Sequence, residues 1–436
     1  MPPDNDCTLN VELNSSLRSD LCEGNFERPL NLIFSFLQRL DHHGAFKGKA
    51  LFLPTIDSYL IEIADRLKAV NHRIQDASNS ERYTDIVICS ELYASGGHTR
   101  LLHELQTLDS RRDLILVTDV FRKYANKAPD VDFPKGPSGT YAPFLLLPNV
   151  SLINKLIMIR DILSSVIPRS VLLLAHPQDV VAICGALCLP KMVPVHFIHH
   201  VDFSPSIGAT IRQFNHIDLF HGTASICQTE QKFPNKILPV TTKQRHLDIS
   251  EKPKRIVATG GPERKYSLTG EACLQRVIAK VISVLDCDFV LYGDFSESAL
   301  KIIRSYLDAT GINMEKFYYE GVVPDLCFTA IERGVSVYID SFPFGGGTSC
   351  IEMMSVGIPV LRYCSTKGSP LERATQSNLT PPALVWEYPE EIPNLIVFSW
   401  NNYISEASKS KNYFDINHSK NTFVEASHRL GLAFQK

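Results

Sequence analysis

Short apolar runs alternate with longer amphipathic segments along most of this chain, and they do so in two separate series. The intervening segments of the first series are long enough for crossover helices, so each run can lie parallel to the next. Such alternation predicts a parallel sheet covered by helices on both faces. The runs of the first series are Asp85–Cys89, Leu114–Thr118, Val171–Ala175, Val195–His199 and Asp218–Phe220.

A polar stretch that contains proline and several lysines, Thr241–Lys254, interrupts the pattern before it begins again. The second series has strand-like runs at Arg255–Thr259, Phe289–Tyr292, Phe317–Tyr319 and Val335–Ile339. We therefore expect an α/β protein with two doubly wound, Rossmann-like domains. The expected parts are a mostly helical N-terminal extension (1–80), a first domain (81–245), a second domain (250–405) and a C-terminal helical segment (406–436).

Composition places the chain among ordinary globular proteins. Its 436 residues suffice for two or three domains, with 44% hydrophobic and 21% charged residues. A net charge of -3 gives no general basic surface for nucleic acid. The first residues form no secretory signal, and the 11 cysteines include no Cys-x-x-Cys pair, which indicates reduced thiols in a cytoplasm. Charged residues break every long apolar region, so we expect no membrane span.

The segment 340–360, DSFPFGGGTSCIEMMSVGIPV, joins a strand end, a three-glycine turn and a helix start. The glycines can take positive φ and let the backbone approach a ligand, while the residues after them offer an N-cap and hydroxyl donors. A helix that begins this way presents amides and a positive dipole end to an anion such as a diphosphate. The candidate ligand-binding residues here are Gly345, Gly346, Gly347, Thr348 and Ser349, with Glu352 expected to bond a ribose hydroxyl or a backbone amide.

Other candidates follow the strands of the second series. Gly261, Arg264 and Lys265 come directly after Arg255–Thr259, and Glu320 follows Phe317–Tyr319. Ligands on doubly wound sheets bind beyond the carboxyl ends of the strands, so these groups should gather on one side. Amides and cations in that arrangement suit a nucleotide diphosphate.

This constellation resembles the C-terminal half of GT-B glycosyltransferases. It is most similar to O-linked N-acetylglucosaminyltransferases and bacterial protein N-glucosyltransferases, which carry an Asp-x-Phe-Pro stretch, a glycine- and threonine-rich loop and a Gly-x-Pro-Val helix end. Here the pattern is Asp340, Phe342 and Pro343, then the loop Gly345–Ser349, then Gly357–Val360. The resemblance covers roughly residues 255–373. It implies two facing domains and a UDP-sugar diphosphate bound by the loop and by Lys265, with Arg264 as its rival.

The first domain should then supply the acceptor side. His98, in the loop and helix start after Asp85–Cys89, could accept the acceptor's proton, or it could merely cap the helix or line the cleft. A second cluster, His199-His200-Val201-Asp202, ends Val195–His199 and resembles the His-His-x-Asp-His stretch of some bacterial enzymes of this architecture. Alternation puts His199 and His200 on opposite faces, and Asp202 could orient a histidine or act as the base. A metal site there is the less favoured interpretation, since the resemblance implies neither metal nor cofactor.

The sequence thus predicts transfer of a sugar from a nucleoside diphosphate donor, UDP-linked, to a protein or glycan acceptor. The Glu-x7-Glu pattern of the large retaining family is absent, because Phe344 stands where the first glutamate would be, and this favours inversion. Two alternatives stay open: a UDP-sugar epimerase of the same architecture and a non-catalytic nucleotide-binding partner subunit. Nucleic acid is not expected as a partner, whereas peripheral membrane contact and the oligomeric state are left open.

Overall fold

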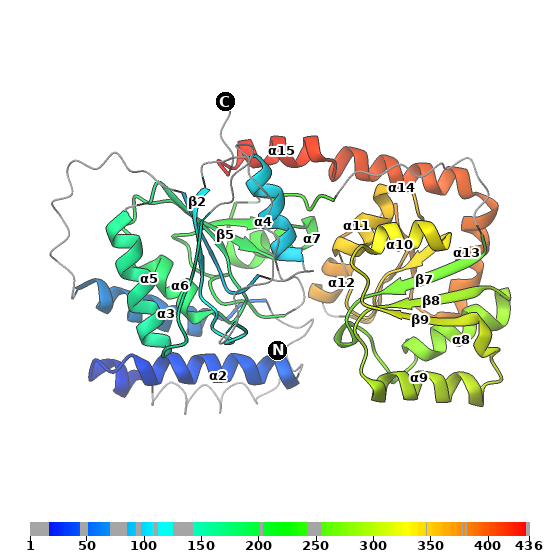
Figure 1. Ribbon diagram of the computed structural model, residues 1–436, viewed down its shortest axis with the longest axis horizontal. Coiled ribbons are helices and arrows are strands. Elements are labelled where there is room, and N and C mark those ends of the chain that lie inside the picture. The colour runs from blue at the N-terminus through cyan, green and yellow to red at the C-terminus, as the bar shows by residue number, and fades with distance from the viewer. Residues whose placement is uncertain are drawn as a thin grey trace. The chain divides into compact units, whose positions relative to one another are not determined.

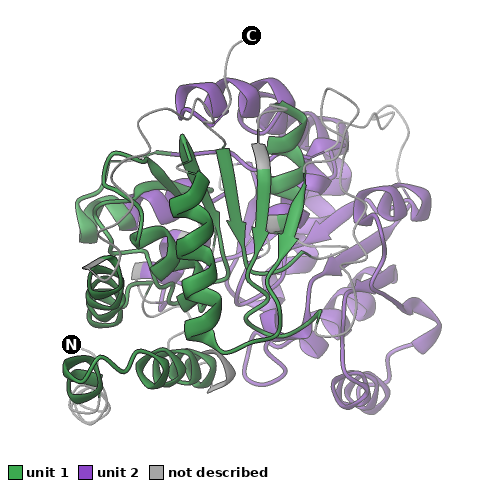
Figure 2. Ribbon diagram, turned by 60° about the vertical axis from the view of Figure 1, so that its left-hand side comes forward, with its two compact units in different colours: residues 1–219, 227–236, 433–436 green, residues 220–226, 237–432 purple. Residues whose placement is uncertain are grey.

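A computed structural model describes most of the chain and divides it into two compact units (Figure 2). Unit 1 comprises residues 1–219, 227–236 and 433–436, and unit 2 comprises residues 220–226 and 237–432. Each unit is described by itself. The described residues are 17–43, 51–69, 85–92, 97–108, 112–124, 143–166, 168–200, 204–234, 236–242, 254–345, 347–368, 370–376, 378–379 and 382–432.

Unit 1 is built on a sheet of six parallel strands (Figure 1). Its spatial order is β3-β2-β1-β4-β5-β6, so the chain starts in the middle, winds to one edge, then returns and winds to the other. Ligands of such sheets bind where the winding reverses, which here is between β1 and β4. The strands are β1 (Asp85–Cys89), β2 (Arg112–Val117), β3 (Phe144–Leu146), β4 (Ser170–Leu174), β5 (Val195–His199) and β6 (Asn215–Asp218).

Helices cover the sheet of unit 1 and form its core with it. The most apolar helix, α6 (Val180–Leu187), is buried along its whole length and begins at Asp179, whose carboxylate accepts a hydrogen bond from the amide of Ala182. Gly185 allows α5 to come close, because a Cβ at this position would lie 2.5 Å from Cγ2 of Ile159. The N-terminal helices pack onto this layer, α2 against α5 and α3 against α6. Further helices of unit 1 are α2 (Glu27–His43), α3 (Pro54–Ala69), α4 (Gly97–Leu108), α5 (Leu152–Val166) and the π-helix Cys227–Gln231, and residues 17–22 are also helical.

Unit 2 repeats the same winding around a second sheet of six parallel strands. The order β12-β11-β10-β7-β8-β9 places the reversal between β7 and β10. Both strands are buried throughout, as expected for strands covered on both faces. The strands are β7 (Ile256–Gly260), β8 (Asp288–Tyr292), β9 (Phe317–Gly321), β10 (Val337–Ile339), β11 (Val360–Tyr363) and β12 (Leu384–Trp386).

The helices of unit 2 have conventional ends. Ser296 caps α9 by accepting from the amide of Ala299, Asp325 caps α10 by accepting from Phe328, and Gly334 ends α10 at a φ of 81°. The α-helices are α7 (His221–Ile226), α8 (Leu274–Leu285), α9 (Glu297–Ala309), α10 (Leu326–Arg333), α11 (Gly347–Ser355), α12 (Pro370–Gln376), α13 (Ile392–Asn401), α14 (Tyr403–Asn417) and α15 (Lys420–Arg429). Short 3-10 turns span Glu263–Lys265, Met314–Lys316 and Pro389–Glu391.

The predicted fold class is confirmed: the chain is α/β, with two doubly wound parallel sheets. Three strands were not predicted, namely β3, β11 and β12. The last predicted run of the first series is displaced, because β6 ends at Asp218 and Phe220 precedes α7. The predicted domain limits remain predictions, and the linker Thr241–Lys254 lies largely outside the described residues. None of the helices in the described ranges combines the length and the hydropathy that crossing a membrane requires.

Candidate functional site

The loops after β7 and β10 meet at the winding reversal of unit 2. They are tied together by backbone hydrogen bonds: the amide of Ser267 donates to the carbonyl of Phe342 over 3.2 Å, and that of Phe344 donates to Lys265 over 3.4 Å. Tyr266 and Pro343 also form an isolated antiparallel bridge. The two candidate segments of the second series, far apart in sequence, therefore lie side by side.

Lys265 reaches across this junction toward the glycine loop. Its ammonium nitrogen lies 3.0 Å from the carbonyl oxygen of Gly345 and donates a hydrogen bond to it. The Lys265 side chain is half-buried, whereas Arg264, its predicted rival, is exposed. The positively charged side chain of Lys265 therefore lies at the N-terminus of α11. Of the two predicted cations, Lys265 and Arg264, Lys265 is the one that contacts the loop.

The glycines of the loop are needed for space. A Cβ at Gly345 would lie 2.3 Å from Nη2 of Arg362 and 2.7 Å from Oδ2 of Asp340, and one at Gly347 would lie 2.1 Å from Cζ of Phe220. Neither glycine is among the described glycines with a positive φ. Gly346 lies outside the described residues. Because Gly345 and Gly347 have no side chains, the loop packs directly against buried groups: Asp340 and Arg362 at the first glycine and Phe220 at the second.

A buried ion pair packs against the glycine loop. Nε of Arg362 in β11 lies 3.1 Å from Oδ2 of Asp340, and both side chains are at most 4% exposed. Oδ1 of Asp340 accepts the amide of Ser341 over 2.8 Å, and the thiol of Cys350 in α11 hydrogen-bonds to the same carboxylate. Burial beside this carboxylate holds the pKa of the Cys350 thiol well above its usual range. Asp340 thus joins β10, β11 and α11 and fixes where the helix begins.

Helix α11 begins at Gly347, two residues earlier than predicted. Thr348 and Ser349 consequently lie in its first turn instead of at the N-cap, and both are half-buried. The Ser349 side chain hydrogen-bonds to the phenol of Tyr338, which in turn donates to the carbonyl of Gly260 over 2.8 Å. The first amides of a helix lack partners within the helix and form its positive end, so this turn can hold an anion beside Lys265.

Gly261 and Glu320 occupy different places relative to this junction. The amide of Gly261 donates to the carbonyl of Tyr292, and a Cβ at Gly261 would meet Ser341 Cβ only at 3.4 Å, an ordinary contact. Glu320 lies within β9 at the sheet edge, two strands away from β7, and pairs with Arg333 over 3.1 Å. The structure therefore gathers Gly261, Lys265 and the glycine loop, and it does not bring Glu320 to them.

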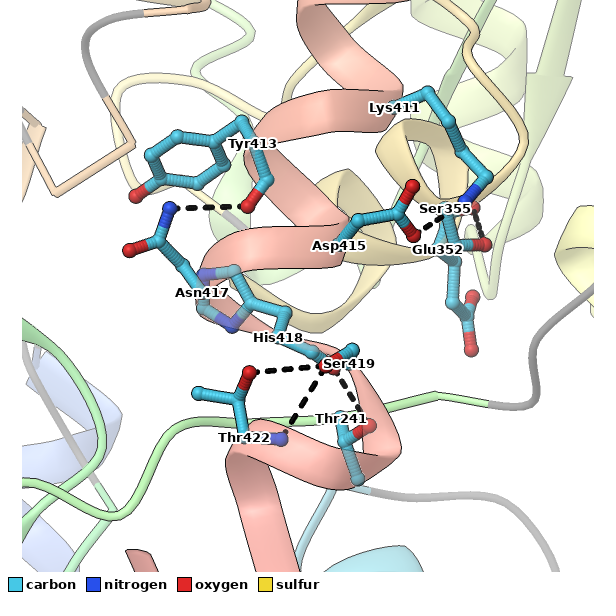
Figure 3. Close-up of polar contacts among 10 residues, drawn as sticks. All are labelled: Thr241, Glu352, Ser355, Lys411, Tyr413, Asp415, Asn417, His418, Ser419 and Thr422. Carbon is cyan, nitrogen blue, oxygen red and sulfur yellow. Dashed lines mark hydrogen bonds and ion pairs between the residues drawn. The ribbon is translucent and has the colours of Figure 1, made fainter. Parts of the chain in front are cut away.

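Glu352 lies in α11, a helix that packs against α14. Its backbone carbonyl accepts the hydroxyl of Ser355 over 2.7 Å, and Figure 3 draws both residues with the α14 residues Lys411 and Asp415. The Glu352 side chain is half-buried. Its role toward a ribose or a backbone amide stays a prediction.

Of the three predicted catalytic residues in unit 1, only His200 has a described side chain. It is half-buried just after β5, with Nδ1 3.4 Å from the carbonyl oxygen of Ile198. Only the backbone of His98 is described, in the first turn of α4, and Asp202 lies outside the described residues. The ring of His199, the last residue of β5, is buried, and its Nδ1 lies 3.3 Å from the thiol of Cys227.

Sequence reasoning missed a buried polar network at the winding reversal of unit 1. Asp179 Oδ2 accepts hydrogen bonds from Ser90 Oγ at 2.6 Å and Thr118 Oγ1 at 2.5 Å, and Ser90 Oγ accepts the amide of His176. Desolvation raises the pKa of Asp179 despite these bonds. The fully buried Lys155 donates to the carbonyls of Thr118 and Asp119. The network fixes the loops after β1, β2 and β4, where the acceptor side was predicted.

Two further residues of the unit 2 site were missed for different reasons. Arg362 carried a signal, because it is a charged residue within the apolar run Val360–Tyr363, and a buried charge needs a partner. Phe220 carried none, since it lies more than a hundred residues before the glycine loop that it touches.

Comparison with known proteins found no matching protein family and no matching curated protein. Solved structures do match. HepE of Anabaena in complex with UDP and glucose is 11% identical with a TM-score of 0.57, over 81% of this chain and 100% of that chain. A glycosyltransferase of Rickettsia africae is 10% identical with a TM-score of 0.56, over 80% and 97%.

The O-GlcNAc transferase of Thermobaculum terrenum is 12% identical with a TM-score of 0.51, over 95% of this chain and 81% of that chain. At these identities the likeness concerns the fold. The repeated winding of two six-stranded parallel sheets and these matches together show that the chain has the two-unit GT-B fold of glycosyltransferases.

Proposed function

We propose that this protein is a glycosyltransferase that moves a sugar from a nucleoside diphosphate sugar, UDP-linked, to a protein or glycan acceptor. The observation that carries the proposal is the hydrogen bond from Lys265 to Gly345 at the start of α11. It places a cation beside a helix N-terminus at the winding reversal of unit 2, where a diphosphate would be bound. Support also comes from HepE, whose structures contain UDP, UDP and glucose, or UDP-glucose.

The donor side would act on the leaving group. As the bond between the anomeric carbon and the diphosphate oxygen breaks, negative charge grows on that oxygen. Lys265 and the first turn of α11, with Thr348 and Ser349, are arranged to neutralise it. The buried pair of Asp340 and Arg362 holds this turn in place before the donor arrives. Gly261 leaves room for the donor at the neighbouring loop, since its amide faces Tyr292 and no side chain projects from it.

The acceptor side would come from unit 1. The acceptor nucleophile attacks the anomeric carbon on the face opposite the diphosphate, and its proton passes to His200, Asp202 or His98. A single displacement of this kind inverts the anomeric centre and needs no covalent enzyme intermediate. Neutralisation of the diphosphate by Lys265 and α11 supplies charge stabilisation that other enzymes take from a metal, so we propose that the transfer itself needs none.

Thermal stabilisation by nucleotides tests the donor site. We expect UDP to raise the melting temperature of the full chain more than GDP, CMP or ADP, and Lys265→Ala to reduce that shift at least severalfold. Lys301→Ala, which removes an exposed lysine of α9, is the matched control and should keep the full shift. A shift that is equal in Lys265→Ala and in the control would contradict the proposed donor site.

Product analysis separates transfer from its alternatives. With a UDP-sugar and an acceptor mixture, a transferase releases UDP, whereas an epimerase yields an isomerised UDP-sugar. UDP binding without turnover of any UDP-sugar would indicate a non-catalytic subunit. Either of these two results would overturn the proposed reaction while leaving the nucleotide site intact.

A further inference from the structure

Three side chains of different chemical type converge at the carboxyl end of the sheet in unit 1. His199 is the last residue of β5, Asp218 is the last residue of β6, and Cys227 begins the π-helix Cys227–Gln231. The register of β5 and β6 pairs His199 directly with Asp218. All three side chains are buried. They share His199 with the cluster of His199, His200 and Asp202 considered from the sequence, but the other two members here are Asp218 and Cys227.

The ligand-type atoms of these residues form a nearly equilateral triangle. Nδ1 of His199 lies 3.2 Å from Oδ1 of Asp218 and 3.3 Å from Sγ of Cys227, and Sγ lies 3.3 Å from the same Oδ1. In tetrahedral zinc sites, bond lengths of about 2.0 to 2.3 Å put neighbouring nitrogen, oxygen and sulfur ligands roughly 3.3 to 3.6 Å apart. One ion can therefore contact all three atoms with only a few tenths of an ångström of adjustment.

Hydrogen bonds alone leave the triangle incompletely paired. With Asp218 ionised, the only protons available to it are one on the thiol and one on Nδ1, so at least one of the three contacts has no hydrogen. His199 Nε2 is buried and has no hydrogen-bond partner among the described residues, so no bond on that side fixes the tautomer. Coordination through Nδ1 would fix it, with the proton on Nε2.

The charges also balance around a divalent ion. A thiolate and a carboxylate together carry two negative charges, and a neutral imidazole adds none. A buried site with no net charge avoids the large cost of an unpaired ion in an apolar interior. Within the described ranges, this is also where at least three histidine, cysteine or acidic side chains come close enough to share an ion.

We propose that His199, Asp218 and Cys227 bind a zinc-like divalent cation. Thiolate, imidazole and carboxylate form a mixed set that suits zinc better than magnesium or calcium, which prefer oxygen ligands. The bound ion links the ends of β5 and β6 to the π-helix and therefore holds the segment that leads into His200. All three ligand residues belong to unit 1. The inference does not depend on the proposed reaction.

Metal content and cobalt spectroscopy of the full chain test the proposal. We expect about one equivalent of zinc in the purified protein, and after removal with a chelator about one equivalent of Co²⁺ should bind. A thiolate-to-cobalt charge-transfer band in the near ultraviolet, with intense visible bands of tetrahedral Co²⁺, should accompany it. Cys227→Ser should lose the charge-transfer band and bind Co²⁺ roughly tenfold more weakly or worse.

Cys184→Ser is the matched control. Cys184 is a fully buried thiol of unit 1 whose Sγ donates to the carbonyl of Leu60 over 3.6 Å. The Cys184→Ser variant should keep the charge-transfer band. Asp218→Asn is a second test in case Cys227→Ser does not fold. This variant should retain the thiolate band but bind Co²⁺ more weakly. Wild-type protein that takes up neither zinc nor Co²⁺ would overturn the proposal, and so would a band that survives in Cys227→Ser.

Discussion

At the scale of single residues, the candidate donor site depends on two glycines at positions where no side chain would fit. Gly345 rests on the buried pair of Asp340 and Arg362, and Gly347 rests on Phe220. Any side chain at either glycine would have to displace a buried group. Gly261 is different, because a methyl group there makes only an ordinary contact with Ser341. The same residue type is therefore required for space at two positions, whereas the third has room for a methyl group.

We predict opposite outcomes for two alanine substitutions. Gly345→Ala should lower the free energy of unfolding of unit 2 by about 3 kcal/mol, because the new Cβ disturbs a buried ion pair. Gly261→Ala should change it by less than about 1 kcal/mol and still weaken the UDP-induced thermal shift. Urea denaturation followed by tryptophan fluorescence measures the free energy of unfolding of both variants, and melting with and without UDP measures the thermal shift. Equal destabilisation by the two substitutions would contradict the steric argument.

At the scale of elements, the turn between α14 and α15 fastens the C-terminal helices to the chain that leads into the second sheet (Figure 3). Nδ1 of His418 lies 2.7 Å from the carbonyl oxygen of Val240, and the carbonyl of His418 accepts the hydroxyl of Thr241, also over 2.7 Å. His418 is 6% exposed. Desolvation lowers the pKa of this imidazole to about 4 despite its bond to the backbone. The turn is therefore built around a neutral histidine.

This gives a prediction for the pH dependence of stability. Below pH 6.5 the unfolded chain takes up a proton on His418 that the folded chain does not accept until about pH 4, so acid favours unfolding. Relative to His418→Asn, which keeps a donor for Val240 but does not titrate, the wild type should lose about 3 kcal/mol between pH 7 and pH 4. Denaturation midpoints measured across this range should diverge. Parallel pH profiles for the two proteins would contradict the assignment.

Elements were predictable from sequence where they obey local rules. The runs Asp85–Cys89 and Val195–His199 coincide with β1 and β5, because short, mostly apolar runs between polar turns are typical of buried strands. β11 was missed since Arg362 interrupts its pattern, and only the tertiary contact with Asp340 explains that arginine. The His199, Asp218 and Cys227 triangle could not be foreseen either, because it depends on strand register and on a π-helix.

At the scale of the whole molecule, the two sheets share one winding, yet the spectroscopic probes are unevenly divided between them. Both tryptophans of the chain, Trp386 and Trp400, belong to unit 2. Trp386 is buried, and the indole nitrogen of Trp400 donates to Ser336 Oγ over 2.8 Å. Tryptophan fluorescence therefore reports on unit 2, whereas far-ultraviolet circular dichroism reports on both units.

We predict that UDP raises the unfolding temperature seen by tryptophan fluorescence, because a ligand stabilises the unit that binds it. At a hundredfold excess over its dissociation constant, the stabilisation should be about 2.7 kcal/mol. Circular dichroism recorded on the same samples shows whether a second transition stays in place. A UDP effect on dichroism with no change in fluorescence would place nucleotide binding in unit 1 and contradict the assignment of the donor site.

The placement of α7 decides where this protein can be cut. Residues 220–226 precede the second sheet by some thirty positions, yet they belong to unit 2: Phe220 fills the space under Gly347, and the amide of Gly222 donates to Asn378 over 2.7 Å. A fragment of unit 2 that starts at residue 237 would contain every strand of its sheet and still have a hole beside the glycine loop. Unit 2 is therefore not one continuous piece of chain, and a fragment of it must include residues 220–226 or have that peptide restored to it.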